Sequence, residues 1–382
     1  MKKCKRSIAA ASALVLSLCC LPLSAAAAEI SPPLPEAVSA EARIVYERFD
    51  SVTEAGLYVR ENLKRHTEEL HIILSPWSGS ADILNDVLGV AFAETGRGDE
   101  GDYLRLSIEG YSSYTGYMLL DQVLDIRFNY NSTIEEEAAF AEKEAEFLAS
   151  MDIDRMDEYE KITAVYDYLV KNVDYAENFE RSEVYTAYGA LVEKVAVCQG
   201  YIQAMYRILT DMGVSCRAVN GEGNGGDHVW GIAAINDTYY LLDPTWDSQF
   251  DGVFKIFFLK GYGDFDEYSS PVVHITGTGD ERNSAFVPDC TSESFTMAYP
   301  VSESAFDPQT YYDSLIRGDL NIDGVIDIFD LISMKKLILS GTASASSLAA
   351  ADVNRDGDIT IGDAVLIQRF IEGSVTDFLN AS

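Results

Sequence analysis

Three side chains that could form a nucleophilic site lie in one short stretch of the chain. Cys198, His228 and Asp243 occur in that order between Tyr188 and Asp247. A cysteine thiolate attacks carbonyl carbons, a histidine takes the thiol proton, and an aspartate holds the imidazole in one tautomer. The set therefore predicts a thiol nucleophile with an oriented base.

The first of these residues, Cys198, opens a segment with helical periodicity. Apolar residues recur after it at helical spacing, namely Ile202, Met205, Tyr206, Leu209 and Met212. Cys198 is therefore expected at a helix N-terminus, where unpaired N–H groups favour a thiolate and could supply half of an oxyanion hole. Gly213 suits the helix C-terminus, and Gly200 would allow close approach to the first turn. Taken alone, such a cysteine is more often a buried structural thiol, so the downstream residues decide.

His228 and Asp243 are expected on the two strands of a hairpin. Apolar, β-prone stretches flank the turn residues Asn236–Asp237. A two-residue loop would form the pairs Ile235–Thr238 and Trp230–Asp243. His228 would then be a diagonal neighbour of Asp243 on the same face, within side-chain reach. A three-residue loop would put the two on opposite faces, so the catalytic interpretation requires the two-residue register.

The surrounding sequence resembles the transglutaminase-like superfamily, whose core is related to papain-like cysteine proteases. The resemblance is carried by AVCQGY, GDHVWGI and YYLLDPTWD and covers about residues 133–270. It implies a catalytic triad of Cys198, His228 and Asp243, with no cofactor for catalysis. Val229 and Gly231 stand where the family usually has Ala and Asn, but neither is a triad position.

A second chemical signal is an internal repeat near the C-terminus. Two similar segments begin at Gly318 and Ala351, 33 residues apart, and each contains D-x-N-x-D-G with a further carboxylate at loop position 12. So many carboxylates repel one another unless a hard cation neutralises them, which predicts two calcium ions. The duplication disfavours the alternative that these are solvated acidic turns.

The spacing assigns oxygen ligands to both loops. The first loop offers Asp319, Asn321, Asp323, the Val325 carbonyl, Asp327 and Asp330. The second loop offers Asp352, Asn354, Asp356, the Asp358 carbonyl, Thr360 and Asp363. A helix is expected after each loop, whereas no convincing helix precedes either.

This duplicated loop–helix pattern resembles a type I-like dockerin, the module that attaches enzymes to the cohesin-bearing scaffoldins of cellulosomes. The match spans nearly all of residues 318–373 and implies a cohesin partner. By that resemblance, the cohesin contacts are Ile328, Phe329, Lys335, Lys336, Ile361, Gly362, Gln368 and Arg369. The two sets differ in chemistry, which argues against a fully symmetric dual binding mode. The Ile328–Phe329 pair fits ordinary helix packing equally well.

The N-terminus predicts export. Residues 1–28 combine a basic start, an apolar run and a small-residue cleavage site, and the run is too short for a membrane anchor. The formal net charge of −34 argues against nucleic acid and anionic membranes as partners, because like charges repel. Beyond the leader only Cys198, Cys216 and Cys290 remain, so the chain is no disulfide scaffold, although a Cys216–Cys290 bridge stays open.

The predicted fold class is α+β, with a papain-like or transglutaminase-like core, an N-terminal α/β segment and a small all-α dockerin. The expected parts are a signal peptide (1–28), an N-terminal segment (29–132), a catalytic core (133–290), a linker (291–317) and the dockerin (318–382). Strands are expected at Leu70–Leu74 and Tyr103–Ile108, and helices at Ala81–Phe92 and Met156–Val173.

Together these features predict a secreted, cellulosome-associated thiol enzyme that acts on a protein or peptide substrate. Attack on a peptide or carboxamide carbonyl would give a thioester, which water would hydrolyse and an amine would convert to a new amide. We favour a peptidase, because secreted dockerin-bearing proteins usually degrade their substrates. A protein cross-linking transglutaminase and a catalytically silent binding module are the alternatives.

Overall fold

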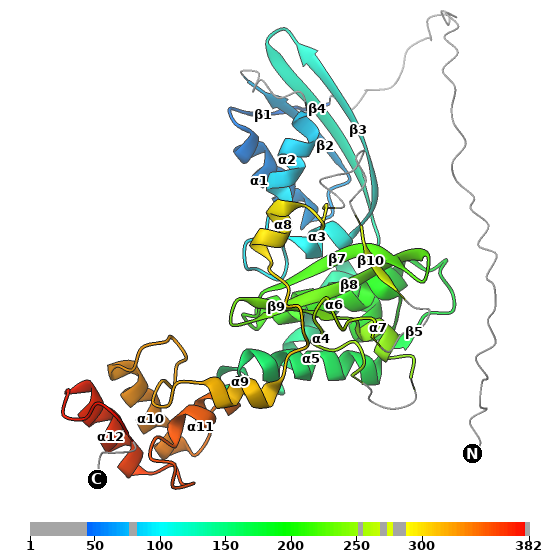
Figure 1. Cartoon of the computed structure of the whole chain (residues 1–382). Coiled ribbons are helices and arrows are strands. Elements are labelled where there is room, and N and C mark those ends of the chain that lie inside the picture. The colour runs from blue at the N-terminus through cyan, green and yellow to red at the C-terminus, as the bar shows by residue number, and fades with distance from the viewer. Residues whose placement is uncertain (1–43, 76–81, 251–254, 268–272, 278–287, 379–382) are drawn as a thin grey trace, which may run out of the picture. The chain divides into compact units, whose positions relative to one another are not determined.

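The computed structural model describes residues 44–75, 82–250, 255–267, 273–277 and 288–378 (Figure 1). The predicted signal peptide, residues 1–28, lies outside these ranges. Among the residues described, none of the helices has the length and apolar character needed to cross a membrane.

The N-terminal part is a four-stranded sheet with helices packed against it. The strand order is β1-β2-β4-β3, with β1 parallel to β2 and the other pairs antiparallel. The strands are β1 (Glu47–Phe49), β2 (Glu69–Leu74), β3 (Ile108–Met118) and β4 (Asp121–Tyr130), and the helices are α1 (Val52–Leu63) and α2 (Ile83–Ala91). Buried apolar side chains from both helices and from β2 and β4 form one core. The strand predicted at Leu70–Leu74 and the helix predicted at Ala81–Phe92 are confirmed.

The strand predicted at Tyr103–Ile108 is wrong. The chain forms the short helix α3 (Asp102–Leu106), and β3 begins only at Ile108. The segment is buried on nearly every side, so its apolar run has no alternation that would separate a strand from a short helix. The buried Asp102 that opens the helix is bound by residues far along the chain, which a local pattern does not show.

A buried ionic cluster joins α3 to the core. Asp102 accepts two hydrogen bonds from Arg217, at 2.7 and 3.1 Å, and one from the Ala218 backbone N–H at 2.9 Å. Glu94 lies 3.3 Å from Arg217 and accepts a hydrogen bond from the Tyr206 hydroxyl. Burial and the neighbouring Asp102 charge raise the pKa of Glu94 to about 7. One guanidinium thus contacts two carboxyl groups, of which Asp102 is 1% exposed and Glu94 is 25% exposed.

The core places one helix across a second sheet. The sheet has the order β10-β7-β8-β9 and consists of β7 (Cys216–Gly223), β8 (Gly226–Ile235), β9 (Thr238–Leu242) and β10 (His274–Thr276). Helix α6 (Cys198–Asp211) is buried on almost every side between this sheet and α5 (Glu158–Asn172). The helix predicted at Met156–Val173 is therefore confirmed, as is the periodic segment after Cys198.

Seven further elements complete the core. They are α4 (Ile134–Ala149), η1 (Ile153–Arg155), β5 (Asp174–Tyr175), η2 (Ser182–Tyr185), η3 (Gly189–Glu193), β6 (Val195–Ala196) and α7 (Pro244–Asp247). Residues 291–317 contain α8 (Glu293–Ala298) and α9 (Pro308–Ser314). Cys216 and Cys290 are buried free thiols, so the bridge left open by the sequence does not form.

The C-terminal module is helical and has its own apolar core. Its helices are α10 (Ile328–Ser340), α11 (Ala345–Ala351) and α12 (Ile361–Ile371). Leu331, Met334, Val353 and Ile367 are fully or almost fully buried in that core. Each loop is followed by a helix as predicted, but α11 also leads directly into the second loop, which corrects the expectation that no helix precedes it. The predicted α+β class, with a small all-α module at its end, is confirmed.

Candidate active site

Helix α6 presents Cys198 at its uncapped N-terminus. The residue before it, Val197, has no side chain that could cap the helix, and Cys198 is partly exposed. A Cβ atom at Gly200 would lie 2.8 Å from the carbonyl oxygens of Thr186 and Val184, so only glycine lets this turn approach them so closely. The first-turn N–H groups beside the sulfur are without partners inside the helix, as an oxyanion site requires.

The hairpin has the register that brings His228 and Asp243 together. Ile235 pairs with Thr238 across the two-residue turn, and Asn236 and Asp237 have φ values of 48° and 59°. Both values belong to the left-handed region that a type I′ turn needs. His228 Nε2 lies 2.8 Å from Asp243 Oδ2. The register predicted from the sequence is confirmed, and the opposite-face arrangement is excluded.

The imidazole of His228 connects Asp243 to the cysteine. Burial alone would lower the pKa of His228, but hydrogen bonds with Asp243 and Cys198 outweigh it and raise the pKa to about 10. Because Asp243 occupies Nε2, the nitrogen that remains for the sulfur is Nδ1. The ring also stacks on Trp246, with centroids 4.9 Å apart, which fixes its plane.

Asp243 is completely buried and uses both of its carboxylate oxygens. Oδ1 accepts hydrogen bonds from the backbone N–H groups of Thr245 and Trp246, at 2.9 and 3.2 Å, and so caps α7. Oδ2 faces His228 and a second histidine, His274. Burial opposes ionisation, but the hydrogen bonds from the two histidines prevail and lower the pKa of Asp243 to about 2. This aspartate is therefore an anion held in a fixed orientation.

A further layer of hydrogen bonds supports the turn that carries Asp243. The Tyr166 hydroxyl on α5 donates to the Asp243 carbonyl at 2.9 Å and lies 2.5 Å from Asp247 Oδ2. Asp247 also accepts from the backbone N–H groups of Ile256 and Phe257, both at 3.1 Å. Burial raises the pKa of Asp247 to about 6.

His274 is the site residue that the sequence did not reveal. It lies on β10, which pairs with β7 and not with a neighbour in sequence. The His228, Asp243 and His274 ligand-type atoms all lie within 4.8 Å of one another. The chain has only four histidines, so their scarcity was a usable signal, but nothing local predicts the β7–β10 pairing.

Both C-terminal loops have the geometry of cation loops. In the first, Asp319 accepts from the backbone N–H groups of Asp323 and Gly324, at 3.2 and 2.9 Å, and Asp330 accepts from those of Leu320 and Asp327, both at 2.8 Å. Asp352 and Asp363 make the equivalent bonds in the second loop.

The loop backbones and charges fit a calcium ion. Position 6 of each loop is a glycine with positive φ, 86° at Gly324 and 90° at Gly357. Burial and the nearby Asp330 carboxylate raise the pKa of Asp319, which a bound cation would reverse. The oxygen atoms that could bind the ion belong to carboxylates, amides and carbonyls, which are the ligands that calcium prefers.

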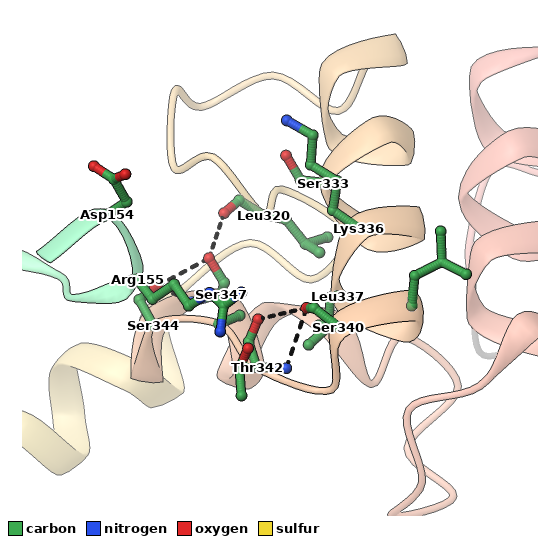
Figure 2. A pocket seen from close by; sticks show the side chains of 12 residues that line it. Asp154, Arg155, Leu320, Ser333, Lys336, Leu337, Ser340, Thr342, Ser344 and Ser347 are labelled. Carbon is green, nitrogen blue, oxygen red and sulfur yellow. Dashed lines mark hydrogen bonds between the residues drawn. The ribbon is translucent and has the colours of Figure 1, made fainter. Parts of the chain in front are cut away.

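The predicted cohesin contacts all lie on the surface. Each of the eight residues is exposed in the part of the chain that the structure describes. Ile328 and Phe329 are 51% and 61% exposed, so they do not serve as ordinary core packing. Lys336 also borders a hollow of about 640 Å³ beside α10, where Ser347 donates a hydrogen bond to the Leu320 carbonyl (Figure 2). Cys198, His228 and Asp243 are not among the residues that line this hollow.

Comparison with known proteins identifies both segments. Residues 146–244 match the family model of the transglutaminase-like superfamily, and residues 317–372 match that of the dockerin type I domain. Both resemblances seen in the sequence are thereby confirmed: the chain contains a transglutaminase-like domain followed by a dockerin domain. Dockerin domains bind cohesin modules, and a dockerin implies calcium binding and an extracellular, cellulosomal context.

Solved structures show only distant similarity. A crystal structure of a TGase is 13% identical, with a TM-score of 0.27, over 47% of this chain and 51% of that one. A putative cysteine protease from Cytophaga hutchinsonii is also 13% identical, with a TM-score of 0.23, over 36% of this chain and 65% of that one. The chain thus spans about half the length of the first of these structures. No curated protein matches the chain.

Proposed function

We propose that this protein is a secreted thiol enzyme that cleaves peptide bonds through a thioester on Cys198. The observation that carries the proposal is the buried Asp243–His228 pair, whose free ring nitrogen serves the cysteine at the N-terminus of α6. A histidine held between a carboxylate and a thiol is the arrangement that makes cysteine a nucleophile.

The first half-reaction transfers an acyl group to sulfur. His228 takes the Cys198 proton, and the thiolate attacks the carbonyl carbon to form a tetrahedral oxyanion, which the free N–H groups of α6 stabilise. The C–N bond then breaks while His228 gives the proton to the departing amine. The raised pKa of His228 keeps the imidazolium available for this donation.

The second half-reaction frees the enzyme. His228 takes a proton from water, the hydroxide attacks the thioester carbon, and the C–S bond breaks to give a carboxylic acid and the thiolate. An amine in place of water would give a new amide, which is the cross-linking alternative. Delivery by a dockerin favours hydrolysis, since such modules bring degradative enzymes to their substrates.

The dockerin would deliver this enzyme to a cohesin module. Two calcium ions would be held by the oxygen ligands of the two loops, each of which directly precedes a helix, α10 or α12, that carries four of the eight exposed contact residues. With the export signal predicted at residues 1–28, the protein would act outside the cell as part of a cellulosome.

Iodoacetamide labelling of the chain without the predicted signal peptide, which contains Cys4, Cys19 and Cys20, tests the proposed nucleophile, because the two other cysteines that remain, Cys216 and Cys290, are buried. We expect rapid alkylation of Cys198 at pH 7 and a loss of at least about tenfold in His228→Ala. Peptide mapping by mass spectrometry identifies the modified residue. Alkylation at the rate of a free thiol, unchanged in His228→Ala, would contradict the proposal and support a silent binding domain.

A further inference from the structure

The second histidine, His274, is enclosed by two carboxylates. Its Nε2 lies 3.1 Å from Asp243 Oδ2, and its Nδ1 lies 2.8 Å from Asp266 Oδ1. Asp266 Oδ2 also accepts a hydrogen bond from the His274 backbone N–H at 3.0 Å, so the same carboxylate contacts both the ring and the main chain. The side chain is only 2% exposed. His274 therefore has a buried side chain and specific contacts to its ring and backbone, and these contacts are not chance encounters at the surface.

Both ring nitrogens of His274 face carboxylate oxygens. A neutral imidazole has one donor and one acceptor nitrogen, and an acceptor nitrogen has no favourable contact with a carboxylate. With both carboxyl groups ionised, both contacts are hydrogen bonds only if both nitrogens carry a proton. The geometry thus selects the imidazolium form.

In the described part of the chain, four aromatic rings also lie against His274. The ring centroid lies 3.9 Å from that of Trp246 and 4.2 Å from that of Phe265, and the rings of Trp230 and Phe257 lie 5.0 and 5.6 Å away. Aromatic faces attract cations, and more strongly where water is excluded. The aromatic rings and the two carboxylates together favour a positive charge on the His274 ring.

We propose that His274 is a positioning residue that, as a buried imidazolium, holds the Asp243 carboxylate for His228 and moderates its charge. The inference rests on the proposed triad, because Asp243 matters here only as the partner of His228. Two imidazoles share one oxygen, Oδ2, so His274 prevents Asp243 from rotating away from His228. Its positive charge also disfavours a second imidazolium, whose ring centroid is 5.6 Å away.

Among the residues that the structure describes, the titratable side chains in contact with His274 include Asp243, Asp266 and His228, and the strand paired with β10 places Gly223 opposite it. The His274→Gln variant keeps a side-chain donor but removes the positive charge. With that charge gone, the imidazolium of His228 becomes easier to maintain, so His228 should titrate at higher pH.

Nitrogen NMR of the histidine rings tests the proposal without any need for activity. In the full chain carrying Cys198→Ala, we expect His274 to show two protonated ring nitrogens at pH 7, assigned by their loss in His274→Gln. A His274 ring with one unprotonated nitrogen at pH 7 would overturn the proposal. Since the nucleophile is absent, this result is independent of whether the chain is an enzyme.

A titration in the same background tests the effect on the triad. We expect His274→Gln to raise the titration midpoint of His228 by about half to one pH unit. The matched control is His71→Gln, because His71 also bonds a carboxylate, Asp125 at 2.8 Å, but lies in the N-terminal sheet. It should leave the midpoint unchanged. A midpoint that is unchanged or lowered in His274→Gln would show a merely structural role, and if that variant fails to fold, the nitrogen spectra of the His274-containing chain still decide.

Discussion

At the scale of single residues, the site depends on how one buried carboxylate is used. Asp243 caps a helix with one oxygen and serves two histidines with the other. The aspartate cannot rotate without breaking several hydrogen bonds at once, so the tautomer and plane of His228 are fixed before any substrate binds. Such preorganisation is what makes an oriented base effective.

Replacing Asp243 should therefore disable the thiol. Asp243→Asn keeps the size of the side chain but removes the charge that supports the imidazolium, and we expect the rate of Cys198 alkylation at pH 7 to fall at least about tenfold. The control is Asp227→Asn, since Asp227 adjoins His228 in sequence but is exposed, and its rate should change by less than about twofold. Equal rates in the two variants would contradict the role given to Asp243.

The raised pKa of His228 also predicts how stability depends on pH. A histidine whose folded-state pKa exceeds its unfolded value of about 6.5 contributes stability that is fully present below that value and is lost as pH rises through about 10. Urea unfolding at pH 7 and at about pH 10.5 should show a larger loss of stability in the natural chain than in His228→Gln. The comparison cancels the ionisation of other groups, so identical losses would show that folding does not favour the protonated form of His228.

At the scale of elements, the site is positioned by contacts of short and of long range. Helix α6 is held by Gly200 against the carbonyls of Val184 and Thr186, and the hairpin is set by a two-residue turn. Helix α3 is tied to β7 by the buried pair of Asp102 and Arg217, whose side chains are 1% and 7% exposed. The removal of Asp102 would leave two largely buried guanidiniums, Arg217 and Arg105, with Glu94 as the carboxyl group beside Arg217, and the Ala218 N–H without its acceptor.

Asp102→Ala should accordingly destabilise the fold by about 3–5 kcal/mol, as breaking a buried pair usually does. Chemical unfolding followed by circular dichroism measures the change. The exposed pair of Arg127 and Glu69, 3.5 Å apart, provides the control, and Arg127→Ala should cost less than about 1 kcal/mol. A similar small cost for both variants would mean that α3 is not anchored by this ion pair.

Elements of the site that depend on nearby residues could be predicted from the sequence, and those that depend on distant pairing could not. The periodicity after Cys198 and the turn at Asn236–Asp237 were sufficient to predict Cys198 at a helix N-terminus and His228 beside Asp243, the three residues of the proposed triad. His274 was missed because β10 is three residues long and finds its partner, β7, across intervening chain. Helix α3 was mistaken for a strand because its buried apolar run shows no period.

At the scale of the whole molecule, the proposed catalytic site and the dockerin domain belong to different parts of the chain. The C-terminal module has its own apolar core, and its two loops carry closely matching hydrogen bonds. Calcium would neutralise loop carboxylates that otherwise repel one another. The stability of the C-terminal module should therefore depend on the ion, whereas the stability of the transglutaminase-like domain should not.

Calorimetry with a calcium chelator tests this division. We expect two transitions with calcium present, and chelation should abolish or lower only the one from residues 318–373, since metal binding free energy contributes to folding. The control is Asp319→Ala with Asp352→Ala, which should melt with calcium as the natural chain does in chelator. Loss of the larger transition on chelation would contradict the modular account.

The most direct test of the central claim compares the products of the natural chain with those of Cys198→Ala. Both are incubated with a mixed protein substrate and a labelled primary amine, and mass spectrometry reads new N-termini and amine incorporation at glutamine. We predict new N-termini that require Cys198, which would establish a peptidase and define its cleavage sites. Amine incorporation that requires Cys198 would show acyl transfer in place of hydrolysis, still through the thioester. The absence of both products would contradict the proposal that the chain is an enzyme.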